Sequence, residues 1–456
     1  MKKRLLSLVL TATLAGTLLS GCASAPKEAE KPAEKVTLTY VNWNLGAAED
    51  DNLERRMIKA WNEANPNIQV QIDESMDYSK YGDSLTAAAS AGKLPDVFAL
   101  PNIPFGLQNE WLADVTGQSS KDEDWNKIPK PIEQAVHYGK GIYAVPSGMF
   151  LSGYWVNDDL FQAANVDELG FNPTLEEFKA AVKATTKPAE NILGLSESLQ
   201  IPEWYPAAVN KDYGWFTFDG SKYNLDSPEF KDGIKLANEV LTNKYTFDAL
   251  TEDQKAKLNA KWHGDVWNQG KVAIRWDGSW VTTDFSKLNF KSRFIGTPGG
   301  RATIIGDYLG ISKSSKSVDA AYKFAKYMSF GKDGILKRIE LGSKDNSFNS
   351  LPLSTDKEVL DKYFEMNKFE GLKEAFEDIN NDVVEGVKFV PGYVKSRWEA
   401  QTGVKIGDKD NANIGDVVSN AITGKVKIED YASQLNKLAN DEYQKAVESM
   451  KALTDK

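Results

Sequence analysis

The sequence predicts an α/β fold, because segments with strand and helix periodicity alternate from residue 36 onwards. Residues 36–43 alternate in polarity and are rich in β-branched side chains, which is typical of a strand. Apolar side chains recur at helical spacing in residues 53–61. A second strand at 68–73, a helix at 81–93 and a third strand at 94–100 follow. This order predicts a mainly parallel sheet with right-handed crossovers and helices on its faces.

The rest of the chain continues this alternation. Thr174 and Glu177 have the spacing of a capping box and predict a helix that starts there. The last hundred residues are predicted to be mostly helical, and we find no internal repeat. Further strands are predicted at 141–146, 152–157, 271–276, 293–298 and 307–312, and a further helix at 317–330.

The composition is that of a globular protein with more than one domain. The chain has 456 residues, of which 41% are hydrophobic and 26% charged. Its formal net charge of −10 argues against a nucleic-acid ligand, which needs a basic face. One cysteine cannot form a disulfide within the chain, and with only two histidines beside it a zinc site is not expected. We expect no cofactor.

The N-terminus has the pattern of an export signal. Three basic residues at 2–4 precede an apolar run of 15 residues at 5–19. That run is shorter than the roughly 20 residues of a membrane span. It ends in Leu-Ser-Gly before Cys22, which resembles the lipobox of bacterial lipoproteins, where the cysteine is acylated and the chain is cut before it. A buried structural cysteine is the alternative, but residues 23–35 contain no large apolar side chain to bury it.

Residues 22–35 are expected to be a flexible tether. They are mostly Ala, Pro, Lys and Glu, so burial cannot offset the entropy of ordering them. Two or more acyl chains anchor a protein stably to a membrane. The sequence therefore predicts a signal peptide at 1–21 and a mature protein held by lipid to the extracellular face of the bacterial cell membrane, with no transmembrane helix.

Five stretches, in this order and spacing, resemble one protein family across nearly the whole mature chain. The family is that of the extracellular solute-binding proteins of ABC importers, in the carbohydrate-binding group that includes maltose-binding protein. The first stretch is LTYVNWN, followed by a helix that ends in WNEANPNIQVQI. The second is AAASAGKLPDVFAL, followed by EWLADVT. The other three are GIYAVPSGMFLSGYWVNDDLF, GKVAIRWDGSW and DYLGISKSSKSVDAAYKFAKYMS.

The resemblance implies two α/β lobes with the ligand in the cleft between them. Lobe I would comprise residues 36–149 and 299–332, and lobe II residues 150–298 and 333–456. The chain would cross between the lobes near Ser147–Leu151, near Pro298-Gly299 and near Phe330–Gly334. Ligands of open α/β sheets bind beyond the carboxyl ends of the strands, so binding residues are expected at strand ends that face the cleft.

A sugar ring has an apolar C–H face and a hydroxyl edge, which aromatic rings and planar amides or carboxylates can match. The chain has 12 Trp and 17 Tyr. Trp280 follows the turn signal Asp277-Gly278 after a strand, and the resemblance implies that this Trp stacks on sugar. A core Trp that caps the sheet is the alternative for Trp280. Asp277 would accept hydroxyl protons, or would only form the turn.

Other strand ends and loops supply further expected contacts. Trp43 and Asn44 end the first strand, where the family contacts ligand, and Asn102 follows the third strand. Prolines flank residues 203–205 and would hold them in a preorganised loop. Tyr308 opens a lobe I strand. The full set is Trp43, Asn44, Asn102, Glu203, Trp204, Tyr205, Asp277, Trp280, Tyr308 and Trp398, of which Trp398 is matched to the family by region only.

The resemblance implies a non-enzymatic, monomeric binding protein. It would capture a carbohydrate and deliver it to the transmembrane subunits of an ABC permease. Abundant Trp favours an oligosaccharide over a monosaccharide. Two alternatives stay open: the same fold with a non-sugar solute, and a secreted lipoprotein glycoside hydrolase, since paired carboxylates are not excluded by sequence.

Overall fold

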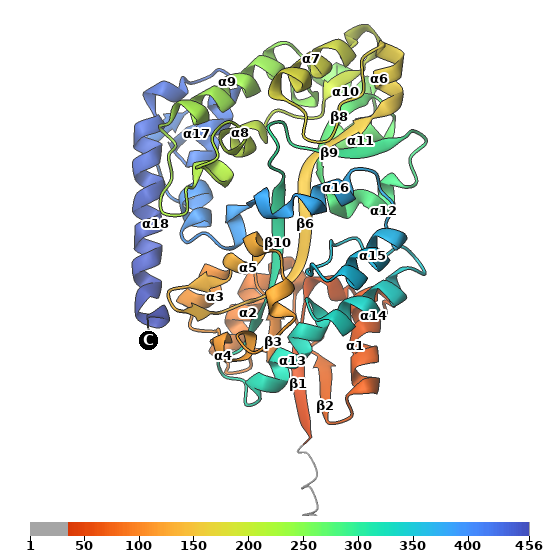
Figure 1. Ribbon diagram of the computed structural model, residues 1–456. Helices are drawn as coiled ribbons and strands as arrows, with labels where there is room; N and C mark the ends of the chain where they lie inside the picture. The colour runs from red at the N-terminus through yellow and green to blue at the C-terminus, as the bar shows by residue number, and fades with distance from the viewer. Residues whose placement is uncertain (1–34, 456) are drawn as a thin grey trace, which may run out of the picture. The chain divides into compact units, whose positions relative to one another are not determined.

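The computed structural model describes residues 35–455 (Figure 1). From Lys35 onwards the chain forms one compact unit. The predicted signal peptide, Cys22 and the tether up to residue 34 lie outside the described residues. Among the residues that the structure describes, no helix has the length and apolar character needed to cross a membrane.

One mixed sheet of nine strands carries the fold, with strand order β2-β1-β3-β10-β6-β8-β7 and with β11 and β9 paired to β10 and β6. β1 is parallel to β2 and β3, β7 is parallel to β8, and β11 is parallel to β10. β10 runs antiparallel to β3 and β6, and β6 runs antiparallel to β8 and β9. The α/β class is confirmed. The strands are β1 Val36–Val41, β2 Ile68–Ile72, β3 Val97–Ala99, β6 Val145–Asn157, β7 Leu193–Leu195, β8 Val272–Gly278, β9 Ser292–Gly296, β10 Thr303–Ile311 and β11 Val383–Val384. Two small hairpins join β4 His137–Tyr138 to β5 Gly141–Ile142 and β12 Val404–Ile406 to β13 Lys409–Ala412.

Helices cover the sheet. Thr174 and Glu177 form the predicted capping box at the start of α7: the Thr174 hydroxyl accepts from the Glu177 backbone N–H at 3.2 Å, and the Glu177 carboxylate accepts from the Thr174 backbone N–H at 2.8 Å. The helices are α1 Leu53–Ala64, α2 Tyr81–Ser90, α3 Ile103–Gln108, α4 Thr116–Ser119, α5 Lys130–Gln134, α6 Asp158–Ala164, α7 Leu175–Thr185, α8 Ile201–Val209, α9 Pro228–Thr242, α10 Glu252–Lys257, α11 His263–Asn268, α12 Thr282–Phe285, α13 Val318–Met328, α14 Lys332–Gly342, α15 Lys357–Met366, α16 Leu372–Glu377, α17 Ile414–Ile422 and α18 Ala432–Thr454.

β6 is a single strand of 13 residues rather than the two short strands predicted on either side of Pro146. Its first part pairs with β10, and from Ser152 onwards it pairs with β8 and β9 (Figure 1). Pro146 is accommodated because the register with β10 shifts between Asp307 and Tyr308, opposite this residue. β6 therefore connects β10 with β8 and β9, and the sequence pattern had not predicted this connection.

The buried side chains form two hydrophobic clusters. The first surrounds β1, β3 and β10 and includes Tyr40 and Phe324. The second lies under α7, α8, α9 and α17 and includes Phe178 and Phe230. Buried residues of the segment from Leu351 to Ile379 also belong to the first cluster, as do Trp155 of β6, Trp267 of α11 and Val272 of β8.

Residues 201–206 form the start of helix α8 and not the predicted proline-bounded loop. Pro202 lies in the first helical turn, where the missing N–H costs nothing and the fixed φ suits the helix. Pro206 lies inside the helix and gives up one backbone hydrogen bond, but its carbonyl still accepts from the Asn210 backbone N–H at 2.9 Å. The two prolines were misread as loop residues because each one alone marks a helix boundary.

Asp382, beside the start of β10, makes the stability of the fold depend on pH. Its Oδ1 accepts from the Ala302 backbone N–H at 2.8 Å, while its Oδ2 is buried without a hydrogen-bond partner. Burial raises the pKa of Asp382 from 3.8 to about 8. The folded state therefore binds this proton more tightly than the unfolded state does, and stability falls as the pH rises from about 4 to about 8.

We expect Asp382→Asn, which mimics the protonated carboxyl, to raise the melting temperature at pH 8.5 and to change it little at pH 4. The gain at pH 8.5 should reach a few kcal/mol, since each unit of pKa shift corresponds to about 1.4 kcal/mol. Calorimetric melting of both proteins across this pH range measures the difference. A gain that is the same at both pH values would contradict the assignment.

Candidate functional site

A cavity of about 370 Å³ lies at the carboxyl end of β1, within the size range of small-molecule sites. Five parts of the chain build it: the segment from β1 into α1, the first part of β6, the turn after β8, β10, and the segment from the end of α13 to residue 353. Its lining residues are Tyr40, Asn42, Trp43, Asn44, Asn52, Leu53, Glu54, Ser147, Gly148, Phe150, Trp280, Asp307, Leu309, Met328, Ser329, Ile335, Arg338, Ser347, Phe348, Asn349, Ser350, Leu351 and Leu353.

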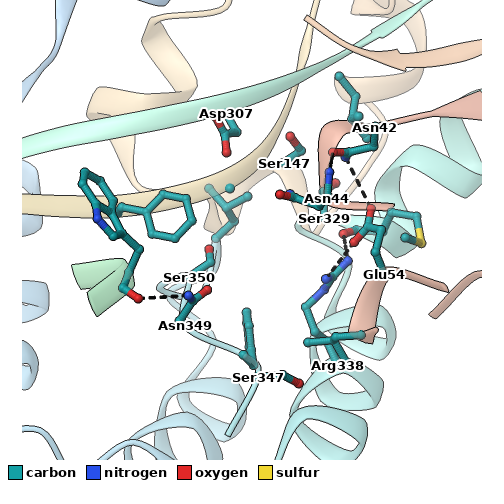
Figure 2. A pocket seen from close by; sticks show the side chains of 18 of the residues that line it. Asn42, Asn44, Glu54, Ser147, Asp307, Ser329, Arg338, Ser347, Asn349 and Ser350 are labelled. Atoms are coloured by element: carbon teal, nitrogen blue, oxygen red, sulfur yellow. Dashed lines mark hydrogen bonds and ion pairs between the residues drawn. The ribbon is translucent and has the colours of Figure 1, made fainter. Parts of the chain in front are cut away.

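One side of this cavity is formed by a hydrogen-bonded network around Glu54 (Figure 2). The Tyr40 hydroxyl donates to Glu54 Oε1 at 2.6 Å, and Asn42 Nδ2 donates to the Tyr40 hydroxyl at 2.8 Å. Arg338 Nη1 donates to Glu54 Oε2 at 3.1 Å. Burial and the Glu54 carboxylate hold the pKa of Tyr40 well above its usual range. Hydrogen bonds thus connect this side of the cavity, and Arg338 compensates the charge of the Glu54 carboxylate.

Two tryptophans from distant parts of the chain line the cavity. Trp43 belongs to a short 3-10 turn, Trp43–Leu45, that Asn42 caps through a 2.9 Å hydrogen bond from the Asn44 backbone N–H. Its ring packs edge-on against Tyr81 at 5.7 Å between centroids. Trp280 lies in the turn that follows β8, is 39% exposed and packs edge-on against Phe150 at 5.7 Å. The fold therefore brings two large aromatic surfaces to one cavity.

Polar side chains complete the lining. Figure 2 shows Asn44, Ser147, Asp307, Asn349 and Ser350 around the open space, carried by four separate segments. Asn349 Nδ2 donates to the Trp280 carbonyl at 3.1 Å and so ties the segment after α14 to the turn after β8. Asp307 forms an ion pair with Lys388, whose ammonium also lies 5.2 Å from the centre of the Trp43 ring. The site thus offers amides, hydroxyls and paired charges beside its aromatic walls.

The presence of a small-molecule cavity agrees with the family to which the sequence is similar. The family model for bacterial extracellular solute-binding proteins matches residues 46–330, more than half of the chain. The chain belongs to the bacterial extracellular solute-binding proteins. No curated protein matches it.

Solved structures share the fold of this solute-binding protein. An ABC substrate-binding protein from Listeria monocytogenes, in complex with cycloalternan, is 20% identical with a TM-score of 0.64, covering 92% of this chain and 99% of that one. An ABC transporter solute-binding protein from Thermotoga lettingae, bound with α-D-tagatose, is 21% identical with a TM-score of 0.63 and coverage of 91% and 100%. The GacH receptor of Streptomyces glaucescens is 18% identical with a TM-score of 0.62 and coverage of 91% and 99%.

Of the residues predicted to bind ligand in this solute-binding protein, Trp43, Asn44 and Trp280 lie together in the lining of the cavity. Asp307 also lines it, whereas the neighbouring Tyr308, which the sequence singled out, is 1% exposed and lies in the core. Successive side chains of a strand point to opposite faces, so the alternation of β10 could have identified Asp307.

Asp277 lies next to the cavity but does not line it. β8 continues through Gly278, so Asp277 is part of the strand and not of a turn. Its carboxylate is paired with Arg275, and its Oδ1 accepts from the Gly278 backbone N–H at 2.8 Å. Burial raises the pKa of Asp277, while Arg275 opposes that shift.

Glu203 and Trp398 line a second cavity of about 400 Å³, bounded by α8, α17 and the π-helical turn Lys395–Glu399. Glu203 forms a buried ion pair with Arg397. Trp398 is 46% exposed. Glu385 also lines this cavity, and burial raises its pKa to about 7.

Three other predicted residues have structural contacts. Trp204 is 2% exposed, and its Nε1 donates to the Tyr154 hydroxyl at 3.1 Å. Tyr205, on the same helix, is half-buried and packs against Gly233. Asn102 caps α3, since its Oδ1 accepts from the Phe105 backbone N–H at 2.8 Å. In residues 35–455 no group of three or more His, Cys, Asp and Glu side chains is arranged to hold a metal ion.

Proposed function

We propose that the protein is the substrate-binding component of an ABC sugar importer and captures a carbohydrate in the cavity between Trp43 and Trp280. The observation that carries this proposal is the pairing of two Trp side chains, from the ends of β1 and β8, with a ring of amides and hydroxyls. Aromatic faces match the C–H face of a sugar, and amides such as Asn44 and Asn349 match its hydroxyl edge. The three similar structures include complexes with cycloalternan, α-D-tagatose and, for the GacH receptor, acarbose, which supports a carbohydrate as the solute.

The charges of the cavity favour a neutral solute. Glu54 is paired with Arg338, and Asp307 is paired with Lys388. A charged ligand would leave either its own charge or the charge of one of these four residues without a partner in a partly buried site, which costs free energy. A neutral carbohydrate accepts and donates hydrogen bonds without disturbing either pair.

Capture would couple to movement of two lobes about strands β6 and β10. β6 pairs with β10 in its first part and with β8 in its last part, and cavity residues come from both parts: Ser147 from β6 itself and Trp280 from the turn after β8. A solute that contacts both sides favours the closed form, because only a difference in affinity between two states shifts their balance. The closed complex would then deliver the solute to the transmembrane subunits of a permease.

The protein would act as a monomer at the extracellular face of the membrane. The anchor would be lipid on Cys22, and residues 22–35 would form the tether. No catalytic step or cofactor is part of this proposal.

A thermal-shift screen of residues 27–456 against mono- and oligosaccharides tests the proposal. A sugar at 100 times its Kd should stabilise the protein by about 2.7 kcal/mol, seen as a higher melting temperature. Shifts from another solute class and from no sugar would overturn the sugar assignment. Release of reducing ends from an oligosaccharide would instead indicate a glycoside hydrolase.

A further inference from the structure

Trp280 is held from three sides in the turn after β8, although its ring is partly exposed. Phe150 of β6 packs edge-on against the ring at 5.7 Å between centroids. Asn349 Nδ2 donates to the Trp280 carbonyl at 3.1 Å. The third side is formed by the two residues that end β8, Asp277 and Gly278. Such support favours binding, because immobilising a mobile side chain on a ligand costs free energy.

Gly278 lies directly against one face of the Trp280 ring. A Cβ added at Gly278 would have as its three nearest atoms Cζ3, Cη2 and Cε3 of Trp280, at 2.2, 2.3 and 2.4 Å. These are consecutive atoms of the six-membered ring, and a point at nearly equal distances from them lies over the face of that ring. The backbone of Gly278 has φ −95° and ψ 163°, an extended conformation that any residue adopts. The missing side chain is therefore needed by the ring and not by the backbone.

Asp277 is fixed beside the ring by contacts of its own. Its carboxylate is paired with Arg275, its Oδ1 accepts from the Gly278 backbone N–H at 2.8 Å, and its carbonyl accepts from Trp155 Nε1 at 3.2 Å. Burial raises the pKa of Asp277, and a side-chain hydrogen bond from Trp280 is among the contacts that oppose this rise. The indole N–H of Trp280 thus has an acceptor whose own position is fixed.

Arg275 keeps Asp277 turned away from the cavity. The guanidinium of Arg275 is buried, and the centres of three aromatic rings lie 5.1–5.8 Å from it, those of Trp262, Trp267 and Phe285. The carboxylate of Asp277 balances this buried charge. If Asp277 turned toward a solute, it would leave the guanidinium without its partner, which costs free energy. This explains why Asp277 lies next to the cavity without lining it.

We propose that Asp277 and Gly278 are positioning residues for solute binding: Asp277 anchors the indole N–H of Trp280, and Gly278 leaves room for one face of the ring, so that the opposite face is presented to the solute. Neither residue touches the solute itself. This inference rests on the function proposed above, and it gives Asp277 a role other than accepting sugar hydroxyls or forming a turn.

Gly278→Ala tests the space under the ring. The added methyl group displaces the ring of Trp280 but is compatible with the backbone, so the variant should fold and bind sugar about tenfold more weakly than wild type. Titration calorimetry with maltotetraose, xylotetraose and chitotetraose measures the affinities. The matched control is Gly117→Ala, because a Cβ added there meets no atom within 4 Å, and it should keep every affinity.

A double-mutant cycle tests Asp277. Asp277→Ala should weaken binding about fivefold, and Asp277→Asn, which keeps an acceptor oxygen, should weaken it less. In a Trp280→Phe protein, which lacks the indole N–H, neither change should weaken binding further, because Asp277 acts only through that group. Asp277→Asn carries the test if Asp277→Ala does not fold. As a control, Asp158→Asn removes the charge from another buried ion pair, with Arg293, and should leave the affinity unchanged.

Fluorine NMR gives a measurement that needs no ligand. In protein labelled with 5-fluorotryptophan, the fluorine is bonded to Cζ3, the ring atom nearest to the Cβ that Gly278→Ala adds. The resonance of Trp280 is the one that Trp280→Phe removes. It should shift in Gly278→Ala and in Asp277→Ala, and it should stay in place in Gly117→Ala.

The outcomes separate the two proposals. A Trp280 resonance that stays in place in the Gly278 and Asp277 variants, or losses of affinity that add up in the double-mutant cycle, would overturn the positioning role and leave the sugar function standing. Absence of binding of all three sugars to wild type would overturn the sugar function, whereas a shifted resonance would still support the anchoring of the ring by Asp277 and Gly278.

Discussion

Trp280→Ala should abolish most of the ligand-induced thermal shift while leaving the unliganded protein folded. Burying one aromatic ring against a sugar accounts for about 2–4 kcal/mol of binding, a loss of roughly 30-fold or more in affinity. A ligand shift of about 2.7 kcal/mol at 100 times Kd would then fall to about 0.9 kcal/mol or less. Because Trp280 is 39% exposed but packs edge-on against Phe150, its removal should lower the free energy of unfolding by about 1–2 kcal/mol, less than truncation of a fully buried Trp.

The matched control is Trp398→Ala, which removes a Trp of similar exposure from the second cavity. If the ligand occupies only the main cavity, this variant keeps its thermal shift. If Trp398→Ala loses the shift and Trp280→Ala keeps it, the sugar lies in the second cavity, and the assignment of the main cavity is wrong. Calorimetric titration of both variants with the sugar found in the screen decides between them.

Trp204→Ala should have the opposite effect, a large loss of stability. Trp204 is 2% exposed, its indole N–H donates to the Tyr154 hydroxyl, and its ring packs edge-on against Tyr154 and Phe178. Truncation leaves a cavity in the second cluster and an unmatched hydroxyl. We expect a cost of about 3–5 kcal/mol, measured by urea denaturation.

A milder variant keeps this prediction testable if Trp204→Ala does not fold. Trp204→Phe retains an aromatic ring but loses the hydrogen bond to Tyr154. It should be destabilised less and should bind the sugar with unchanged affinity. A loss of affinity in a folded Trp204→Phe protein would restore Trp204 to the binding site and would show that the ring becomes accessible when ligand binds.

Local sequence patterns predicted a helix or strand well where the residues of that element alone determine it. The capping box of α7 and the apolar spacing of α1 are properties of a few neighbouring residues, and both helices form as expected. Pro146 and the prolines of α8 were misread, because their effect depends on what lies opposite them. A register shift in β10 accommodates Pro146, and the packing of α8 outweighs the hydrogen bond lost at Pro206.

The candidate site was predicted in part. Trp43, Asn44 and Trp280 lie at strand ends, a position that the α/β pattern itself marks as favourable for ligands. Arg338 and Asn349 line the cavity from α14 and the segment after it, and no sequence pattern connected them with β1. Their contribution depends on contacts between residues about 300 positions apart in the chain, such as Arg338 with Glu54.

By itself, the sequence determined the alternation of strands and helices, the export pattern before Cys22 and the family resemblance, because each can be read from short stretches of neighbouring residues and their order along the chain. Only the tertiary structure decided which tryptophans face a cavity. Trp204, Trp262 and Trp280 are chemically identical, and their roles differ because long-range packing buries the first and leaves the other two partly exposed. Burial depends on the whole fold, so it cannot be deduced from the identity of a residue or from its immediate neighbours.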